Sequence, residues 1–142
     1  MKTVLFVCIH NAGRSQMAEA LLNHLAAQRG LAVRALSAGT VAGKEINPAG
    51  REVMAEIGIA MDGQRPKPLT QAMADAADRV VTMGCGVDAE ACPARIHLSE
   101  DWGLEDPKNA PVEKVREIRD QIRSKVETLL ADMTRLDAGA AA

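Results

Sequence analysis

The first fifteen residues restrict the fold of this chain more than any other segment. Residues 3–7 form a continuous apolar run rich in β-branched side chains, which is typical of a strand buried on both faces of a parallel sheet. A helical pattern begins at Arg14, so residues 8–13 connect a strand to a helix. This order predicts an α/β protein with a doubly wound sheet, in which ligands bind beyond the carboxyl ends of the strands.

The rest of the chain continues the alternation of strands and helices. Three further strands are predicted, over residues 31–37, 79–83 and 96–98. Four helices are predicted: from Arg14 to a cap at Gly30, from the Asn47 cap and Pro48 to Gly58, over 69–77, and for about 24 residues after Pro111. Its 142 residues match the usual length of one domain, so we expect a single domain over 1–137 and a frayed tail over 138–142.

Charge and composition argue against nucleic-acid and membrane functions. Seventeen Lys and Arg side chains against nineteen Asp and Glu give a net charge of −2, so the chain has no broad basic surface for a nucleic-acid backbone. One Phe, one Trp and no Tyr leave no platform on which bases could stack. The early apolar run is far shorter than the roughly 20 residues that cross a bilayer, so we expect a soluble, cytoplasmic protein.

The three cysteines indicate reactivity or metal binding. Cys8, Cys85 and Cys92 are an odd number and lack the dense spacing of a secreted disulfide framework. In a reducing compartment, such cysteines serve as reactive thiols or as metal ligands. A zinc site of three cysteines and a histidine is disfavoured because no two cysteines have the close spacing typical of such sites, and we therefore expect no metal.

The loop between Cys8 and Arg14 has the composition of an oxyanion site. Five intervening residues allow backbone N–H groups to surround a tetrahedral oxyanion at a helix N-terminus, and the Arg14 guanidinium adds a bidentate fork. The same donors favour a thiolate at Cys8, because helix N-termini and nearby cations lower the pKa of a thiol. A buried structural cysteine would not explain the positions of Arg14 and Ser15. The predicted oxyanion-binding residues are Ile9, His10, Asn11, Ala12, Gly13, Arg14 and Ser15.

Motifs along nearly the whole chain, up to about Leu130, resemble a known family. They are Val7-Cys8-x-x-Asn11-x-Gly13-Arg14-Ser15, Ser37-Ala38-Gly39-Thr40, Val80-Val81-Thr82-Met83 and Asp101-Trp102-Gly103-Leu104-Glu105-Asp106-Pro107. The sequence resembles the low-molecular-weight phosphotyrosine phosphatase superfamily. Within it, Cys85 and Cys92, the latter followed by Pro93, are similar to the thioredoxin-coupled arsenate reductase branch. The resemblance implies a four-stranded parallel sheet of order 2-1-3-4, flanked by helices.

The resemblance also implies an arsenic-detoxifying reaction. Arsenate needs two electrons to become arsenite, and two cysteines supply them when they form a disulfide. Cys8 would attack arsenate, with Arg14 stabilising charge and Asp106 protonating the departing oxygen. Cys85 would then attack Cys8, and Cys92 would attack Cys85, leaving a Cys85–Cys92 disulfide for thioredoxin to reduce.

Two other functions remain as alternatives. A protein tyrosine or small-molecule phosphatase would need only Cys8, Arg14 and Asp106, and it would leave Cys85 and Cys92 without a role. A non-catalytic zinc or oxyanion-binding module would use the three cysteines and one histidine as ligands. Arsenate-dependent oxidation of thioredoxin separates these readings.

The resemblance carries one further expectation, a monovalent cation near the site. In potassium-binding relatives, Asn11, Glu19 and Ser37 match cation-site positions. The acidic residue expected near position 67 is replaced by Lys67 in this chain. These residues therefore allow a second interpretation, in which the Lys67 ammonium group takes the place of the bound cation.

Overall fold

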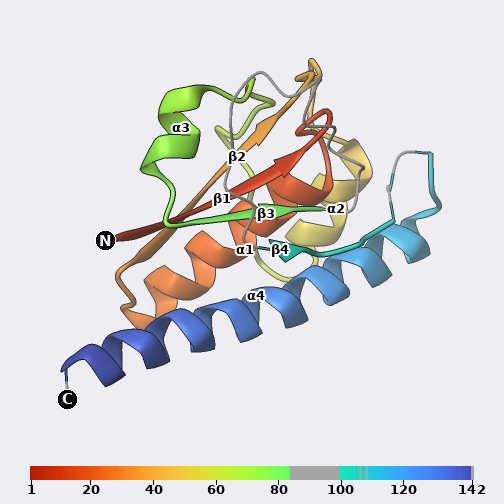
Figure 1. The fold of residues 1–142 in the computed structure, drawn as a ribbon. Helices are drawn as coiled ribbons and strands as arrows, with labels where there is room; N and C mark the ends of the chain where they lie inside the picture. The colour runs from red at the N-terminus through yellow and green to blue at the C-terminus, as the bar shows by residue number, and fades with distance from the viewer. Residues whose placement is uncertain (84–99, 106, 108, 142) are drawn as a thin grey trace.

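A four-stranded parallel sheet forms the centre of the described part of the molecule (Figure 1). The structure is a computed structural model, and it describes residues 1–83, 100–105, 107 and 109–141. Its strands are β1 (Lys2–Cys8), β2 (Val33–Gly39), β3 (Arg79–Thr82) and β4 (Glu100–Asp101), in the order β2-β1-β3-β4. The α/β class and the strand order 2-1-3-4 are both confirmed.

The side chains of β1 alternate between two apolar layers. Val4, Phe6 and Cys8 pack into the larger cluster, together with residues of helices α1 (Arg14–Arg29), α2 (Pro48–Ala55) and α4 (Val112–Ala141). Leu5 and Val7 face the smaller cluster, against which helix α3 (Gln71–Ala76) packs. Figure 1 shows α3 on the opposite side of the sheet from α4. Burial on both faces explains the continuous apolar run that β1 shows in the sequence.

Local signals predicted the end of α1 and the start of α2, each of which has a capping residue. Gly30 ends α1 in a left-handed conformation (φ 65°), and Asn47 caps α2 by accepting a hydrogen bond from the Ala49 N–H at 3.0 Å. Helix α2 is regular only to Ala55, and the chain leaves it through Gly58 at φ 77°. Helix α3 starts two residues later than predicted because the Thr70 side chain caps it. The 30 residues of α4 exceed the predicted length.

Strand β2 begins and ends two residues later than predicted. The Leu31 N–H donates to the Ala26 carbonyl at 2.8 Å, so Leu31 belongs to the end of α1. At the other end, pairing with β1 continues until Gly39 lies opposite Cys8. The predicted strand at 96–98 lies outside the described residues, and β4 pairs with Val81 and Thr82. Within the described ranges, no helix has the length and apolarity to span a membrane.

Trp102 anchors the segment that follows β4. Its side chain is 6% exposed, and its ring centroid lies 5.3 Å from that of Phe6, with the rings tilted by 54°. Its backbone N–H donates to the Thr82 carbonyl at 2.9 Å. These contacts fix residues 102–104 against β1 and β3, close to the ends of both strands.

An ion-pair cluster joins α2 to α4. Glu56 accepts hydrogen bonds from Arg116 at 2.7 and 2.9 Å and from Arg119 at 2.9 Å. The bonds from Arg116, with a smaller contribution from Arg119, lower the pKa of Glu56 from 4.5 to about 2. Arg119 is buried and also donates to the Val53 carbonyl at 2.7 Å. The cluster therefore fixes the end of α2 to the middle of α4.

The Glu56→Gln variant should be less stable than the wild type at pH 7, with a difference that disappears in acid. Because the folded-state pKa of about 2 lies below the unfolded value of 4.5, the contribution of Glu56 is complete above about pH 4.5 and is lost as the pH falls toward 2. Urea unfolding of both proteins at pH 7, 5, 4 and 3 measures the difference. An equal difference at pH 7 and pH 3 would contradict this account.

Candidate functional site

The loop after β1 places the Cys8 sulfur between two hydrogen-bonding groups. Cys8 is the last residue of β1 and is 3% exposed. The backbone N–H of Asn11 donates to the Cys8 Sγ at 3.1 Å, and the Ser15 Oγ lies 2.9 Å from the same sulfur. Because Ser15 Oγ accepts from Asn11 Nδ2 at 2.8 Å, its own proton can point to the sulfur. Two donors at one sulfur stabilise a thiolate.

Arg14 connects this loop to two other segments. Its side chain is almost fully buried in the first turn of α1, and its Nη1 donates to the Met83 carbonyl at 3.0 Å and the Leu104 carbonyl at 2.8 Å. Met83 follows β3, and Leu104 belongs to the segment anchored by Trp102. Backbone carbonyls of both segments thus hold the guanidinium in position beside the loop.

A cavity of about 760 Å³ opens over the loop at the carboxyl ends of the strands. Its wall consists of Cys8, Ile9, His10, Ala12, Gly13, Arg14, Gly43, Glu45, Ile46, Asn47, Pro48, Leu104, Glu105, Pro107 and Asn109. Of the predicted oxyanion-binding residues, all except Asn11 and Ser15 line it. Asn11 and Ser15 are instead buried, and they contact the Cys8 sulfur through the Asn11 backbone N–H and the Ser15 hydroxyl. The predicted residues therefore divide into five that line the cavity and two, Asn11 and Ser15, that form a buried support for the Cys8 sulfur.

Three predicted residues lie outside the part of the chain that the structure describes. They are Cys85, Cys92 and Asp106. Both chain neighbours of Asp106, Glu105 and Pro107, line the cavity.

A charged pair lies beside the buried support. The Lys67 Nζ is 3.6 Å from the Glu19 Oε1, which also accepts a hydrogen bond from the Ser37 hydroxyl at 3.2 Å. Burial raises the pKa of Glu19, and Lys67 and Ser37 oppose that shift. The Lys67 backbone N–H donates to the Asn11 Oδ1 at 2.9 Å. Among the described residues, no cluster of three or more His, Cys, Asp and Glu side chains forms a metal site.

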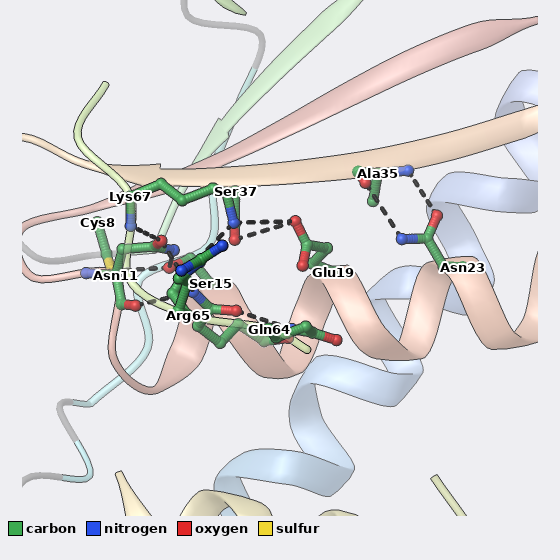
Figure 2. A network of polar contacts seen from close by, with 11 residues as sticks. Cys8, Asn11, Ser15, Glu19, Asn23, Ala35, Ser37, Gln64, Arg65 and Lys67 are labelled. Atoms are coloured by element: carbon green, nitrogen blue, oxygen red, sulfur yellow. Dashed lines mark hydrogen bonds and ion pairs between the residues drawn. The ribbon is translucent and has the colours of Figure 1, made fainter. Parts of the chain in front are cut away.

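Sequence reasoning missed the contacts that hold Asn11 from behind. Asn11 adopts a left-handed conformation, with φ 52°, and the buried Gln16 amide donates to its Oδ1 at 2.8 Å. Figure 2 shows Gln64, Arg65 and Lys67 around this region, beside Asn11 and Ser15. These residues come from a loop about fifty positions further along the chain, so no local pattern marks them. The one available signal is a polar side chain, Gln16, beside the apolar stripe of α1.

The Arg14→Ala variant should bind phosphate, sulfate and arsenate more weakly than the wild type, by about 10- to 100-fold for each. The reason is that one charge-assisted fork serves any tetrahedral oxyanion, and such bonds contribute about 1.5–3 kcal/mol. Calorimetric titration with each anion measures the effect. Arg14→Lys keeps the charge but loses the bidentate fork, so its anion affinities should lie between those of the wild type and Arg14→Ala. An unchanged sulfate affinity in Arg14→Ala would place the anion site elsewhere.

Comparison with known proteins gives a consistent result. The family model of low molecular weight phosphotyrosine protein phosphatases matches residues 3–138. A glutaredoxin arsenate reductase of Synechocystis is 36% identical over 135 residues, which are 94% of this chain and 100% of the relative. A solved arsenate reductase in the phosphate binding state is 36% identical, with a TM-score of 0.80 over 93% of this chain and 98% of that chain. A thioredoxin-dependent arsenate reductase of Corynebacterium glutamicum is 39% identical, with a TM-score of 0.76 over 94% of this chain and 62% of that one.

Proposed function

The chain belongs to the low molecular weight phosphotyrosine protein phosphatase family, and from that premise we propose that it reduces arsenate to arsenite with thioredoxin as electron donor. The observation that carries this proposal is the placement of Cys8 in the oxyanion loop, with Asn11 and Ser15 on its sulfur and Arg14 beside the same cavity. Similarity to arsenate reductases over nearly the whole chain supports the choice of substrate.

The first step forms a covalent arsenic adduct. The Cys8 thiolate attacks the arsenic atom of arsenate, and a sulfur–arsenic bond replaces one arsenic–oxygen bond. Asp106 donates a proton to the departing oxygen, which leaves as water. Arg14 and the loop N–H groups bind the remaining oxygens, where negative charge develops. These roles for Asp106 and Arg14 are part of the proposal.

The second stage transfers two electrons. The Cys85 thiolate attacks the Cys8 sulfur, so that a disulfide forms and the electrons of the sulfur–arsenic bond pass to arsenic, which leaves as arsenite. Cys92 then attacks Cys85, which releases the Cys8 thiolate and forms a Cys85–Cys92 disulfide. The dithiol of thioredoxin reduces that disulfide and is itself oxidised. A reducing compartment such as the cytoplasm sustains this cycle.

The decisive experiment is an assay of thioredoxin oxidation. Arsenate should cause the purified protein to oxidise reduced thioredoxin, followed as NADPH consumption in the presence of thioredoxin reductase, with one arsenite formed per NADPH. The alternative is a phosphatase that uses Cys8, Arg14 and Asp106, which the family's name favours. Hydrolysis of para-nitrophenyl phosphate without any arsenate-dependent NADPH consumption would establish that alternative and overturn ours.

We propose that Lys67 replaces a monovalent cation beside the loop. Asn11, Glu19 and Ser37 match the positions of a cation site, but the Lys67 ammonium lies 3.6 Å from Glu19 and already balances its charge. The present residues therefore do not fit an additional cation near Glu19. The resulting network joins Glu19 to the oxyanion loop through the Lys67 backbone and Asn11.

The Lys67→Met variant should become sensitive to potassium, whereas the wild type should not. Loss of the ammonium leaves the buried Glu19 carboxylate with its Ser37 hydrogen bond but without an opposite charge, and we expect the Tm to fall by about 5 °C in choline chloride. Potassium chloride at equal ionic strength should restore part of that loss. Calorimetry of both proteins in the two salts measures it. A wild type that potassium stabilises as strongly as the variant would contradict the replacement.

A further inference from the structure

The reaction described above does not use Gln16, although Gln16 is among the most deeply buried polar residues near the loop. Its side chain is 0% exposed in the first turn of α1, one position after Ser15. Its Nε2 donates to the Asn11 carbonyl at 3.0 Å, the Asn11 Oδ1 at 2.8 Å and the Arg65 carbonyl at 2.9 Å. Three acceptors surround a group with two hydrogens, so this amide is fully engaged.

A second amide orients the first. The Gln64 Nε2 donates to the Gln16 Oε1 at 2.7 Å and to the Gln16 backbone carbonyl at 3.2 Å. Because the Gln16 oxygen receives this bond, its nitrogen must face Asn11 and Arg65. The orientation of the Gln16 amide is therefore set by a partly exposed residue 48 positions away in sequence. In Figure 2, Gln64 lies on the same side of Ser15 as Arg65.

Asn11 is the residue that transmits this arrangement to the sulfur. Its left-handed backbone, at φ 52°, is uncommon for residues other than glycine, although asparagine is among those that adopt it most often. In that conformation the Asn11 N–H points at the Cys8 sulfur and the Asn11 Nδ2 at the Ser15 Oγ. Gln16 holds both the backbone carbonyl and the side-chain oxygen of Asn11, and so it restricts rotation at both ends of this residue.

We propose that Gln16 is a positioning residue for the Cys8 nucleophile: its buried amide, oriented by Gln64, holds Asn11 so that two hydrogen bonds reach the sulfur. The inference rests on the proposed role of Cys8 as nucleophile. It concerns the ionisation of that thiol, which can be measured without arsenate, so it can fail independently of the proposed function.

The test measures the pH profile of Cys8 alkylation. In a Cys85→Ser, Cys92→Ser background, Cys8 is the single thiol, and its rate of reaction with iodoacetamide follows the thiolate fraction. Gln16→Met keeps the length of the side chain and removes its hydrogen bonds. We expect the midpoint of the profile to rise by about one pH unit and the rate well below that midpoint to fall by about tenfold. Gln64→Met should shift the profile in the same direction by less.

Asn23 provides the matched control on the same helix. Its amide braces β2 in a similar way, donating to the Ala35 carbonyl at 3.1 Å and accepting from the Ala35 N–H at 2.8 Å, but it does not contact the loop. Asn23→Ala should lower the free energy of unfolding and leave the alkylation profile unchanged.

Two outcomes would overturn the inference. The first is a folded Gln16→Met protein whose profile matches that of the parent. If Gln16→Met does not fold, Gln64→Met decides, because it leaves the Gln16 amide in place and removes only its orientation; an unchanged profile there overturns the proposal. An upward shift in this background, together with a wild-type protein that fails to reduce arsenate, would support the role of Gln16 and reject the proposed function.

Discussion

The Cys8→Ser variant is expected to lose arsenate reduction entirely, by at least about 10⁴-fold. A serine hydroxyl stays protonated at neutral pH, and it cannot form the disulfide that provides the two electrons. The hydrogen bonds from Asn11 and Ser15, which stabilise a thiolate, cannot compensate for this loss. Arsenite released per protein in a single turnover, measured by chromatography, gives the result. Activity in Cys8→Ser would mean that the nucleophile is wrongly assigned.

The matched variant for that experiment is Cys92→Ser. It keeps Cys8 and Cys85, so it should release one equivalent of arsenite and then stop, with a Cys8–Cys85 disulfide detectable by mass spectrometry. The contrast between no turnover and one turnover separates the nucleophile from the residue that regenerates it. Repeated turnover of Cys92→Ser with thioredoxin would show that the catalytic cycle does not need Cys92.

The second large effect is expected at Gly39, where β2 passes the oxyanion loop. A Cβ atom at this position would lie 2.6 Å from the Ile9 carbonyl oxygen and 3.0 Å from the Asn11 N. Both contacts are with backbone, so no side chain can rotate away, and the loop itself must move. We expect Gly39→Ala to lower the free energy of unfolding by about 2–3 kcal/mol and to weaken phosphate binding by at least about tenfold.

Gly43 supplies the control for this prediction. A Cβ atom there would meet the His10 carbonyl oxygen at 3.5 Å, which is an ordinary van der Waals contact, although Gly43 lines the same cavity. Gly43→Ala should therefore bind phosphate within a few-fold of the wild type. Urea unfolding and phosphate calorimetry on both variants test the pair. Equal phosphate affinity in Gly39→Ala and Gly43→Ala would show that the loop tolerates the displacement.

The features of the fold that could be predicted are those set by residues close together in the sequence. Strand β1 was predicted because burial on both faces demands an apolar run, and the end of α1 because Gly30 can adopt a left-handed conformation. The boundaries of β2 were wrong by two residues because they depend on pairing. Whether Leu31 joins the strand is decided by its bond to Ala26, and where β2 ends is decided by its alignment with β1.

The site shows the same division. The Cys8 and Arg14 spacing predicted the loop, because the residues that surround an oxyanion are consecutive in the chain. The support behind the loop could not be predicted in the same way: Gln64 and Lys67 reach Gln16 and Asn11 through tertiary contacts alone. The roles assigned to Cys85, Cys92 and Asp106 remain predictions from the sequence, since these residues lie outside the described part of the chain.

The position of Trp102 makes it an intrinsic fluorescence probe of the oxyanion loop. It is the sole tryptophan, and the chain has no tyrosine, so ultraviolet-excited emission comes essentially from one indole. That indole packs on Phe6 beneath the sheet, two residues before Leu104, whose carbonyl holds Arg14. Binding of an oxyanion to the guanidinium is thereby connected, through one short piece of backbone, to the environment of a single fluorophore. We therefore expect anion binding in the cavity to change the emission wavelength and intensity of Trp102 fluorescence, which can be measured in the unlabelled protein.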